Sequence, residues 1–319
     1  MFFAYDKLHK NDFDFLNNNF DQKIKRLNIK KLKLKEFRGN IVIITPYVDL
    51  ILEKYLLTAS NEISIYILIT SNGTDKSSFN KLKNKKNIII ANSKSNSLNV
   101  AEYALALILD SYKKISLHDN FIKKNDWCKF GSKNFLPPKK LKKKNFAIYG
   151  FGNVGKKIFK MLRGFDVNIG TFQNSHLKKK LPKKLILFKN LKALSAWADC
   201  HINCLPLNKI NRNFFDQFFF KNIKESVFIN ISRGEVVDLN ALISAYKKKK
   251  ILHYATDVFN QYPKKNEETT EIKKLKKISC TLSPKRAGFL ENELPHLQDI
   301  LYNMKLILKF KKNLRNVIN

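Results

Sequence analysis

The chain lacks the features that mark several classes of protein. Its four cysteines form no Cys-x-x-Cys pair and stand beside no cluster of histidines, so no metal site is predicted and the thiols are expected to be buried and reduced. No apolar run reaches the roughly 18 residues that a membrane span needs. The first residues lack the basic start and apolar core of a signal peptide. We therefore expect a cytoplasmic protein with no membrane partner.

Acidic residues are scarce beside basic ones. The 319 residues include 26 acidic and 61 basic side chains, which give a formal net charge of +35. Such an excess raises nucleic-acid binding as a hypothesis. The lysines are spread over the whole length, however, and no stacking-aromatic motif or recognition helix accompanies them. We therefore expect no nucleic-acid partner and infer a general attraction for small anionic substrates.

Glycine is also infrequent, yet three of the ten glycines stand together in the most informative stretch, residues 146–155. An apolar run before them predicts a buried strand, and the apolar spacing after them predicts a helix. The pattern Gly150-x-Gly152-x-x-Gly155 between a strand and a helix is typical of a dinucleotide-binding turn. Gly150 permits the tight turn, Gly152 lets the backbone approach a pyrophosphate, and Gly155 lets the helix pack on the strand.

The acidic residue that usually binds the adenosine ribose is missing. A dinucleotide-binding domain commonly places Asp or Glu about 20 residues beyond the turn, after its second strand. The second strand is expected at 167–172, and Gln173 follows it. Glutamine does not repel a 2′-phosphate, and basic residues come next: His176, Lys178, Lys179 and Lys180. The sequence therefore predicts NAD or NADP as cofactor without choosing between them.

Alternating strand-like and helical segments predict an α/β protein of two domains. Apolar runs at 41–44, 65–69 and 88–91, with a helical segment at 50–59, predict a small parallel domain. Further strand-like runs complete a doubly wound sheet after the glycine turn: 185–188, 200–205, 227–231 and 251–255. A helix expected at 98–109 is apolar nearly all round, so a second domain or a second subunit has to cover it.

Several separate motifs follow one another along the chain. They are Asn99–Leu107, Trp127 ahead of Pro137-Pro138, the glycine turn, Cys204–Leu207, Asn230–Asp238, Asp257–Phe259 and Asn316–Ile318. In these motifs the chain resembles the D-isomer-specific 2-hydroxyacid dehydrogenases, the group that includes phosphoglycerate, D-lactate and formate dehydrogenases. The resemblance implies a Rossmann NAD(P)-binding domain (96–283) inserted into a flavodoxin-like substrate-binding domain (1–95 and 284–319), with the ligand cleft between them. It also implies a homodimer to which the helix at 98–109 contributes.

The resemblance further implies roles for individual residues. Arg233 is expected to bind the carboxylate and keto oxygen of a small 2-oxo or 2-hydroxy acid, because its planar guanidinium gives two charge-assisted hydrogen bonds. A structural salt bridge to Glu235 is the alternative. Backbone amides of Ser71, Asn72 and Gly73 are expected to bind the same carboxylate. The cofactor-binding positions are Gly150, Gly152, Asn153, Val154, Gly155, Gln173, Leu205, Pro206, Ile231 and Asp257, the last of which orients the nicotinamide amide.

Two catalytic positions depart from the family pattern. The family's general acid/base is a histidine after Thr-Pro, and here Lys285 follows Ser-Pro. The residue that holds this histidine follows Asp-Val-Phe after two residues, and here it is Tyr262. An unperturbed lysine, with a pKa of about 10.4, is a poor acid and base at neutral pH. A shifted alignment would recover a carboxylate from Glu267, Glu268 or Glu271, but not the histidine.

Two functional hypotheses follow from this combination of family motifs and altered catalytic positions. In the first, the protein is an NAD(P)-dependent oxidoreductase that transfers a hydride to or from C2 of the acid. Lys285 and Tyr262 then form the acid/base pair, and each lowers the pKa of the other. In the second, the protein binds cofactor and acid without turnover, as a binding or regulatory protein. We favour the enzyme because Arg233, Asp257 and the glycine turn are all present. The sequence names neither the acid nor the direction of the reaction.

Overall fold

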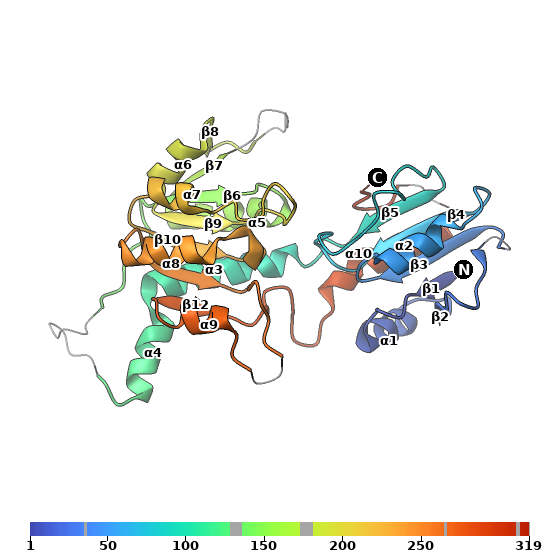
Figure 1. Ribbon diagram of the computed structural model, residues 1–319, viewed down its shortest axis with the longest axis horizontal. Helices are drawn as coiled ribbons and strands as arrows, with labels where there is room; N and C mark the ends of the chain where they lie inside the picture. Colours follow the sequence, from blue (N-terminus) through green and yellow to red (C-terminus); the bar gives the residue numbers. More distant parts are fainter. Residues whose placement is uncertain (35–36, 128–135, 173–180, 265–266, 311–312, 319) are drawn as a thin grey trace. The chain divides into compact units, whose positions relative to one another are not determined.

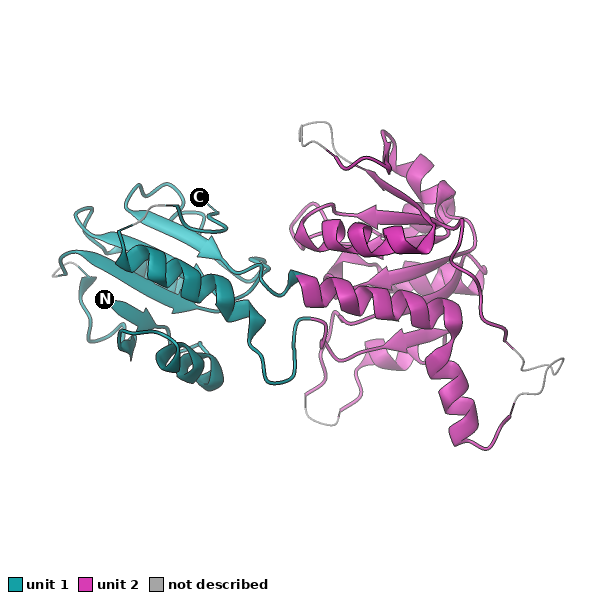
Figure 2. Cartoon of the chain, turned by 180° about the vertical axis from the view of Figure 1, so that it is seen from behind, with its two compact units in different colours: residues 1–97, 288–319 teal, residues 98–287 magenta. Residues whose placement is uncertain are grey.

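The computed structural model divides the chain into two compact units (Figure 2). It describes residues 1–319 except 35–36, 128–135, 173–180, 265–266, 311–312 and 319. Unit 1 comprises 1–97 and 288–319, and unit 2 comprises 98–287. The sequence placed the domain boundaries after residues 95 and 283. The boundaries between the two units follow residues 97 and 287, two and four residues later. No helix in the described parts of the chain has the length and apolar character that crossing a membrane requires.

Unit 1 is a five-stranded parallel sheet with helices on both faces (Figure 1). Its elements are β1 (Phe2–Ala4), α1 (Lys10–Asn18), β2 (Ile24–Arg26), β3 (Asn40–Thr45), α2 (Leu50–Leu57), β4 (Ser64–Ile69), β5 (Ile88–Asn92), η4 (Pro295–Leu297) and α10 (Gln298–Leu308). The strand order β2-β1-β3-β4-β5 is the flavodoxin-like order. The sequence did not predict β1 and β2, because three residues are too few to show a strand's periodicity.

The two faces of this sheet bury two separate cores. Helix α2 packs through Leu52 against one face, where Ile43 of β3 points. Helices α1 and α10 pack through Leu16 and Met304 against the other face, where Val42 points. Successive residues of a strand face opposite sides of a sheet, so a strand covered on both sides has to be apolar throughout. This explains why β3 was recognisable as one continuous apolar run.

Unit 2 is a seven-stranded parallel sheet. Its elements are α3 (Ser97–Lys113, starting at the last residue of unit 1), α4 (Ile115–Lys123), β6 (Asn145–Tyr149), α5 (Asn153–Leu162), η2 (Arg163–Phe165), β7 (Asn168–Phe172), β8 (Leu185–Phe188), α6 (Leu191–Trp197), β9 (Cys200–Asn203), α7 (Gln217–Asn222), β10 (Ser226–Asn230), η3 (Gly234–Val236), α8 (Leu239–Lys247), β11 (Ile251–Thr256), α9 (Thr270–Leu275) and β12 (Cys280–Leu282). The order β12-β11-β10-β9-β6-β7-β8 is the doubly wound order of dinucleotide-binding domains. It reverses between β6 and β9.

Helices cover both faces of the unit 2 sheet. Helices α3 and α5 bury Ala104 and Ile158 on one face, while α6, α7 and α8 bury Leu194, Phe219 and Leu242 on the other. Most of the apolar surface of α3 is therefore covered within its own unit. The sequence predicted that a second domain or subunit covers this helix. Such cover is needed chiefly at the start of α3, where Leu98 is exposed.

Three of the four cysteines are described, and all three are free. Cys200 is buried, whereas Cys204 and Cys280 are partly buried. Cys128 lies outside the described residues. Burial raises the pKa of the Cys204 thiol to about 12, so this thiol is neutral at physiological pH and is not a nucleophile.

Candidate functional site

Five neighbouring strands of unit 2 deliver predicted site residues to one edge of the sheet. Gly150 follows β6, Leu205 follows β9, Arg233 follows β10, Asp257 follows β11 and Lys285 follows β12. Because the strands are parallel, their carboxyl ends meet at the same edge. The reversal of strand order between β6 and β9 lies on this edge, and open α/β sheets bind their ligands at such a point. The topology thus assembles the candidate site from five separate segments.

The three glycines of the turn occupy three different environments. Gly150 has a φ of +93°, and a Cβ there would lie 2.7 Å from the carbonyl carbon of Cys204. A Cβ at Gly155 would lie 2.4 Å from the Gly150 carbonyl oxygen, so α5 packs directly on the turn. A Cβ at Gly152 would meet nothing within 4 Å. Of the three, only Gly152 faces open space, as expected for the position that a pyrophosphate approaches.

The start of α5 offers hydrogen-bond donors beside this space. Gly152 is the N-cap of the helix, and no side chain caps this end. The N–H groups of the first helical residues, Asn153 and Val154, have no acceptor within the helix and favour an anion. The residues present therefore fit a nicotinamide dinucleotide. The predicted ribose-side positions lie outside the described residues: Gln173, His176 and 178–180.

Two buried asparagines hold the loops after β9 and β10: Asn230, which begins the motif Asn230–Asp238, and Asn203, which belongs to none of the motifs. Asn203 Nδ2 donates to Asn230 Oδ1 at 3.0 Å. Asn203 Oδ1 accepts from the Leu205 backbone N–H at 3.0 Å, and Asn230 Nδ2 donates to the Arg233 carbonyl at 3.1 Å. The pair thus fixes the backbone on both sides of the site. A signal was available, because each of the two strands ends in an asparagine.

The loops after β9 and β10 are also joined directly. The Ser232 hydroxyl donates to the Leu205 carbonyl. Leu205 is partly buried and Pro206 is exposed, so both present surface at the site edge. Ile231 is buried in the core beneath α3 and α5, so its side chain faces away from any ligand. A cofactor at this edge would meet the backbone of Ile231 and not its side chain.

Arg233, Tyr262, Lys285 and Glu271 form a cluster that we call the Arg233 corner. Its backbone segments are in very close contact, because a Cβ at Gly234 would lie 2.2 Å from the Phe259 carbonyl carbon. The Phe259 N–H donates to Tyr262 Oη at 3.3 Å. Only glycine at position 234 leaves room for this approach. Gly234 therefore allows the loop after β11 to lie beside Arg233.

The pKa of Tyr262 is raised from its ordinary value of 10.0, chiefly because burial penalises the phenolate. The hydrogen bond from Phe259 and the charge of Arg233 lower this pKa but do not offset the burial. The sequence-based expectation of a lowered phenol pKa was therefore wrong. Tyr262 is still 43% exposed, so the burial that raises its pKa is partial, and the sequence motif did not reveal it.

Lys285 and Tyr262 lie beside one another, and their role as an acid/base pair stays a prediction. Lys285 Nζ lies over the Tyr262 ring, 4.9 Å from its centroid, which is a cation–π arrangement. The backbone of Lys285 is left-handed, with a φ of +59°, a conformation that is uncommon for residues other than glycine and asparagine. The surrounding loop must therefore hold it in place.

Asp257 provides that hold. It is only 2% exposed, and its Oδ1 accepts from the Ser283 hydroxyl and the Arg286 N–H, each at 2.7 Å. Its Oδ2 accepts from the Ala287 N–H at 2.9 Å. The carboxylate thus anchors the loop that carries Lys285. The role in orienting a nicotinamide amide, which the family resemblance implies, stays a prediction.

Glu271, one of the three alternative carboxylates, lies in the same corner. It belongs to the first turn of α9 and is 7% exposed. Its Oε2 accepts from the Gln261 N–H at 2.9 Å, and its Oε1 accepts from Asn260 Nδ2 at 3.5 Å. Burial raises the pKa of Glu271, and the charge of Glu235 adds to this rise, while hydrogen bonds from the backbone of Gln261 and Asn260 lower it. Glu271 orients the backbone turn that leads to Tyr262.

In unit 1 the predicted carboxylate-binding loop follows β4. The Ser71 hydroxyl lies 2.8 Å from the carbonyl oxygens of both Pro46 and Gly73. Asn92 Nδ2 donates to the Asn72 carbonyl at 2.7 Å. Among the described residues, the backbone N–H groups of Asn72 and Gly73 donate to no protein acceptor. The loop is therefore held by its carbonyls and hydroxyl, and its amides remain available to a ligand.

The chain is similar to known proteins in sequence and in fold. Residues 105–284, more than half of the chain, match the family model described as D-isomer specific 2-hydroxyacid dehydrogenase, NAD binding domain. The chain is 30% identical over 203 residues to a 2-ketogluconate reductase of Gluconobacter oxydans, and 31% identical over 178 residues to a glyoxylate reductase of Pyrococcus horikoshii. These regions cover 63% and 54% of this chain, and 63% and 53% of the two relatives.

One solved structure extends the likeness over the whole chain. The D-lactate dehydrogenase of Aquifex aeolicus, solved with NAD and lactic acid, superposes with a TM-score of 0.77 and 18% identity. The match covers 99% of this chain and 98% of that one. At this identity the likeness establishes a common fold.

Proposed function

This chain belongs to the D-isomer specific 2-hydroxyacid dehydrogenase family, and from that membership we propose that it is an NAD(P)-dependent oxidoreductase. The proposed reaction transfers a hydride between the nicotinamide ring and C2 of a small 2-oxo or D-2-hydroxy acid. One observation carries the proposal: the glycine turn and Arg233 reach the same edge of one sheet. We place the reaction in the cytosol, where both cofactors occur and free thiols stay reduced.

In this proposal the nicotinamide cofactor supplies or accepts the hydride when bound. The turn Gly150–Gly155 would hold its pyrophosphate at the start of α5, where Gly152 leaves space and the helix N–H groups are free. The remaining contacts are assigned to Leu205, Pro206, the backbone of Ile231, and Asp257. Gln173 keeps its assignment to the ribose.

Arg233 is proposed to bind the acid. Its planar guanidinium matches a carboxylate with two parallel hydrogen bonds, which a lysine ammonium cannot provide in the same geometry. The contact between Gly234 and the Phe259 backbone places Arg233 in the loop next to Tyr262. The amides of the Ser71–Gly73 loop are a second candidate for binding a carboxylate, because they have no protein acceptor among the described residues.

Tyr262 is proposed to hold the proton that the reduced acid takes up. Because its pKa is raised above 10.0, the phenol is protonated at neutral pH and can donate from Oη. The Lys285 ammonium over the ring stabilises negative charge as the proton leaves. The same raised pKa makes the phenolate, the form needed as a base, scarce at neutral pH. We therefore propose that reduction of the 2-oxo acid is the faster direction.

We further propose that the protein is a homodimer. Helix α3 leaves Leu98 exposed, and the segment after it exposes Ile115, Ile122 and Trp127 by 62%, 52% and 77%. Apolar side chains exposed along one segment are typical of a surface that another molecule covers. Analytical ultracentrifugation at micromolar concentration should show a dimer, and the double variant Ile115→Lys/Ile122→Lys should shift it towards a monomer. A monomeric wild-type protein would contradict this proposal.

A cofactor titration followed by an acid panel tests the enzymatic function. We expect NADH or NADPH to bind with micromolar-range affinity, measured by the fluorescence of the reduced nicotinamide. Loss of absorbance of the reduced cofactor should then show reduction of at least one of glyoxylate, hydroxypyruvate, 2-ketogluconate and pyruvate. Cofactor binding without reduction of any acid would favour the binding or regulatory alternative.

A further inference from the structure

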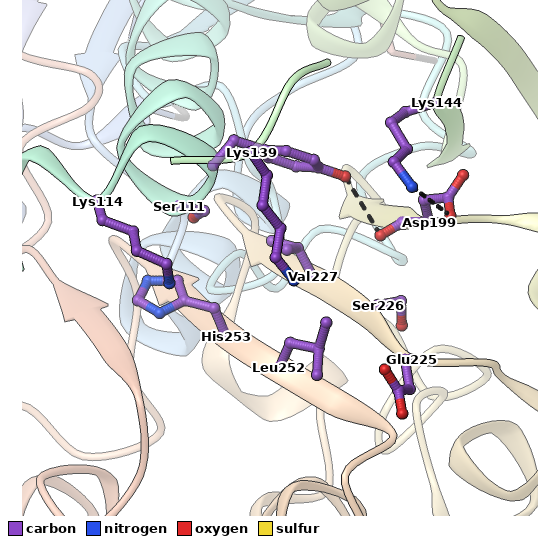
Figure 3. A pocket seen from close by; sticks show the side chains of 11 residues that line it. Ser111, Lys114, Lys139, Lys144, Asp199, Glu225, Ser226, Val227, Leu252 and His253 are labelled. Atoms are coloured by element: carbon purple, nitrogen blue, oxygen red, sulfur yellow. Dashed lines mark hydrogen bonds and ion pairs between the residues drawn. The ribbon is translucent and has the colours of Figure 1, made fainter. Parts of the chain in front are cut away.

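A pocket with several lysines lies at the opposite edge of the unit 2 sheet (Figure 3). Its floor is formed where β10 and β11 begin, by Ser226 and His253 among others. The end of α3 contributes Tyr112, Lys114 directly follows this helix, and Lys139 comes from the segment before β6. The glycine turn and the Arg233 corner lie at the carboxyl ends of the same sheet. The pocket is therefore separate from the proposed active site.

Two lysines reach this pocket from backbone positions that the fold fixes. Lys114 directly follows α3 with a φ of +59°, and its N–H donates to the Asp110 carbonyl at 2.6 Å. The Lys139 N–H donates to the Tyr112 carbonyl at 2.7 Å. Figure 3 shows both side chains extending towards the strands that carry Val227 and His253. In the part of the chain that the structure describes, neither lysine forms an ion pair.

The charges around the pocket leave these two ammonium groups poorly compensated. Burial lowers the pKa of Lys114, and the neighbouring charge of Lys139 lowers it further, which is partly offset by Asp110. Two carboxylates line the pocket, Asp199 and Glu225. Asp199 is already engaged, because its Oδ1 lies 3.5 Å from Lys144 Nζ and 3.2 Å from Lys224 Nζ. A like-charge pair held at one pocket is the arrangement that an anion relieves.

The neighbouring polar groups are also engaged with each other. His253 is neutral, because burial and then the charge of Lys114 lower its pKa to about 4. Its Nε2 lies 3.0 Å from the Thr281 hydroxyl, which donates to Asp110 Oδ2 at 2.7 Å. Asp110 Oδ1 accepts from the Ser116 N–H. Both oxygens of the Asp110 carboxylate therefore already accept a hydrogen bond from a neighbouring group.

We propose that this pocket binds a small dianionic oxyanion, a phosphate group, between the ammonium groups of Lys114 and Lys139. Two ammonium groups match a dianion in charge, and each provides a charge-assisted hydrogen bond. The pocket has a volume of about 60 Å³. One water molecule needs about 10–15 Å³ on this measure, so a group of phosphate size has room. Lys139 is exposed, so the remainder of a phosphate monoester can project into water.

Calorimetric titration with inorganic phosphate and with glycerol 3-phosphate, at constant ionic strength, tests the proposal. The double variant Lys114→Met/Lys139→Met should lose about tenfold or more in affinity, since it removes two charge-assisted contacts. The matched control Lys247→Met/Lys248→Met changes the charge equally at two exposed positions at the end of α8 and should bind as the wild type does. If the first variant folds poorly, Lys139→Glu, at an exposed position, takes its place and should also lower the affinity for phosphate.

The glycine turn is a competing phosphate site, and Gly152→Val separates the two. This variant should keep its phosphate affinity, whether or not the proposed enzymatic function is right. The proposal fails if the wild type does not bind either ligand, if the control pair loses as much affinity as the pocket pair, or if Gly152→Val abolishes binding. The two lysines would then serve only to offset the carbonyl groups at the end of α3. Tighter binding of the monoester would identify a metabolite-borne phosphate group as the ligand, and equal binding would identify free phosphate.

Discussion

The glycine turn and the Arg233 corner share one edge of the unit 2 sheet but are built in different ways. The turn is one contiguous segment in which each glycine meets a local requirement: a positive φ at Gly150, open space at Gly152 and close packing at Gly155. The corner collects side chains from loops that follow β10, β11 and β12 and from α9. Because each glycine of the contiguous turn meets a separate requirement, the turn cannot change its pattern and still bind its ligand. A corner assembled from several loops can exchange individual side chains, and the two positions that the sequence predicts to depart from the family pattern, Lys285 and Tyr262, both lie there.

The largest effect is expected at the turn. Gly152→Val should abolish binding of NADH and NADPH, because its side chain would fill the space beside the start of α5. Gly164→Val is a matched control, since a Cβ there also meets nothing within 4 Å but lies away from the turn. Circular dichroism should show both variants folded, and fluorescence titration should show that only the first has lost the cofactor. Undiminished binding by Gly152→Val would remove the cofactor site from the turn.

The corner is tested next, through its proton donor. Tyr262→Phe keeps the ring under Lys285 but removes the hydroxyl, and it should cost about 10²- to 10⁴-fold in turnover with cofactor affinity nearly unchanged. Lys285→Met should lower turnover in the same direction. Tyr302→Phe is the matched control, because Tyr302 also lies under a cation, with Arg315 Cζ 3.5 Å from its ring centroid, but belongs to unit 1.

The pH dependence of reduction gives the same residue a second test. A donor must be protonated, and burial raises the pKa of Tyr262 above 10.0. Ionisation of Tyr262 should therefore not lower the rate of reduction between neutral pH and pH 10.0. The rate should fall above pH 10.0, as the phenol ionises. A decline that begins below pH 10.0 and disappears in Tyr262→Phe would show that the pKa is lowered, as the sequence alone suggested.

A smaller effect is expected where the corner's two loops touch. Gly234→Ala places a Cβ 2.2 Å from the Phe259 carbonyl carbon, so the loops must separate. Overpacking of this kind costs about 1–3 kcal/mol, which denaturant unfolding can measure. Gly152→Ala is the control, since its Cβ meets open space and should leave the free energy of unfolding unchanged. Equal stability of the two variants would mean that the contact does not hold the corner together.

The last prediction concerns β9, the strand between the turn and the corner. His201 in this strand is fully buried, burial lowers its pKa to about 3, and its Nδ1 lies 2.9 Å from Tyr149 Oη. Between pH 6.5 and this value the unfolded chain binds a proton that the folded chain does not. The free energy of unfolding should therefore fall as the pH drops below 6.5, by at most about 1.4 kcal/mol per pH unit from this group.

Comparison of two variants isolates this contribution. His201→Phe should flatten the acid dependence of the unfolding free energy, although it leaves Tyr149 without its partner. The same substitution at the partly exposed His118 on α4 is the control. If His201→Phe and the wild type lose stability in parallel on acidification, buried His201 does not cause the acid dependence of the unfolding free energy.

Much of the fold was predictable from the sequence because strands buried on both faces are continuous apolar runs. This holds for β3, β4, β5, β6 and β10. The strands that were not predicted, β1, β2 and β12, have three residues each. Strand pairing brought further residues into the site, since Asn203 and Asn230 are opposite one another only through the register of β9 with β10. That register is invisible in either segment alone.

By itself the sequence determined the cofactor turn, because the demands on Gly150, Gly152 and Gly155 arise from the backbone of one short segment. It also determined which residues follow each strand and hence that they share an edge. Only the tertiary structure decided how the corner titrates and what supports it. The raised pKa of Tyr262 comes from partial burial of its side chain, and the Glu271 carboxylate reaches the same turn from another helix. Burial and hydrogen-bond partners are properties of packing, and packing joins segments that no local pattern connects.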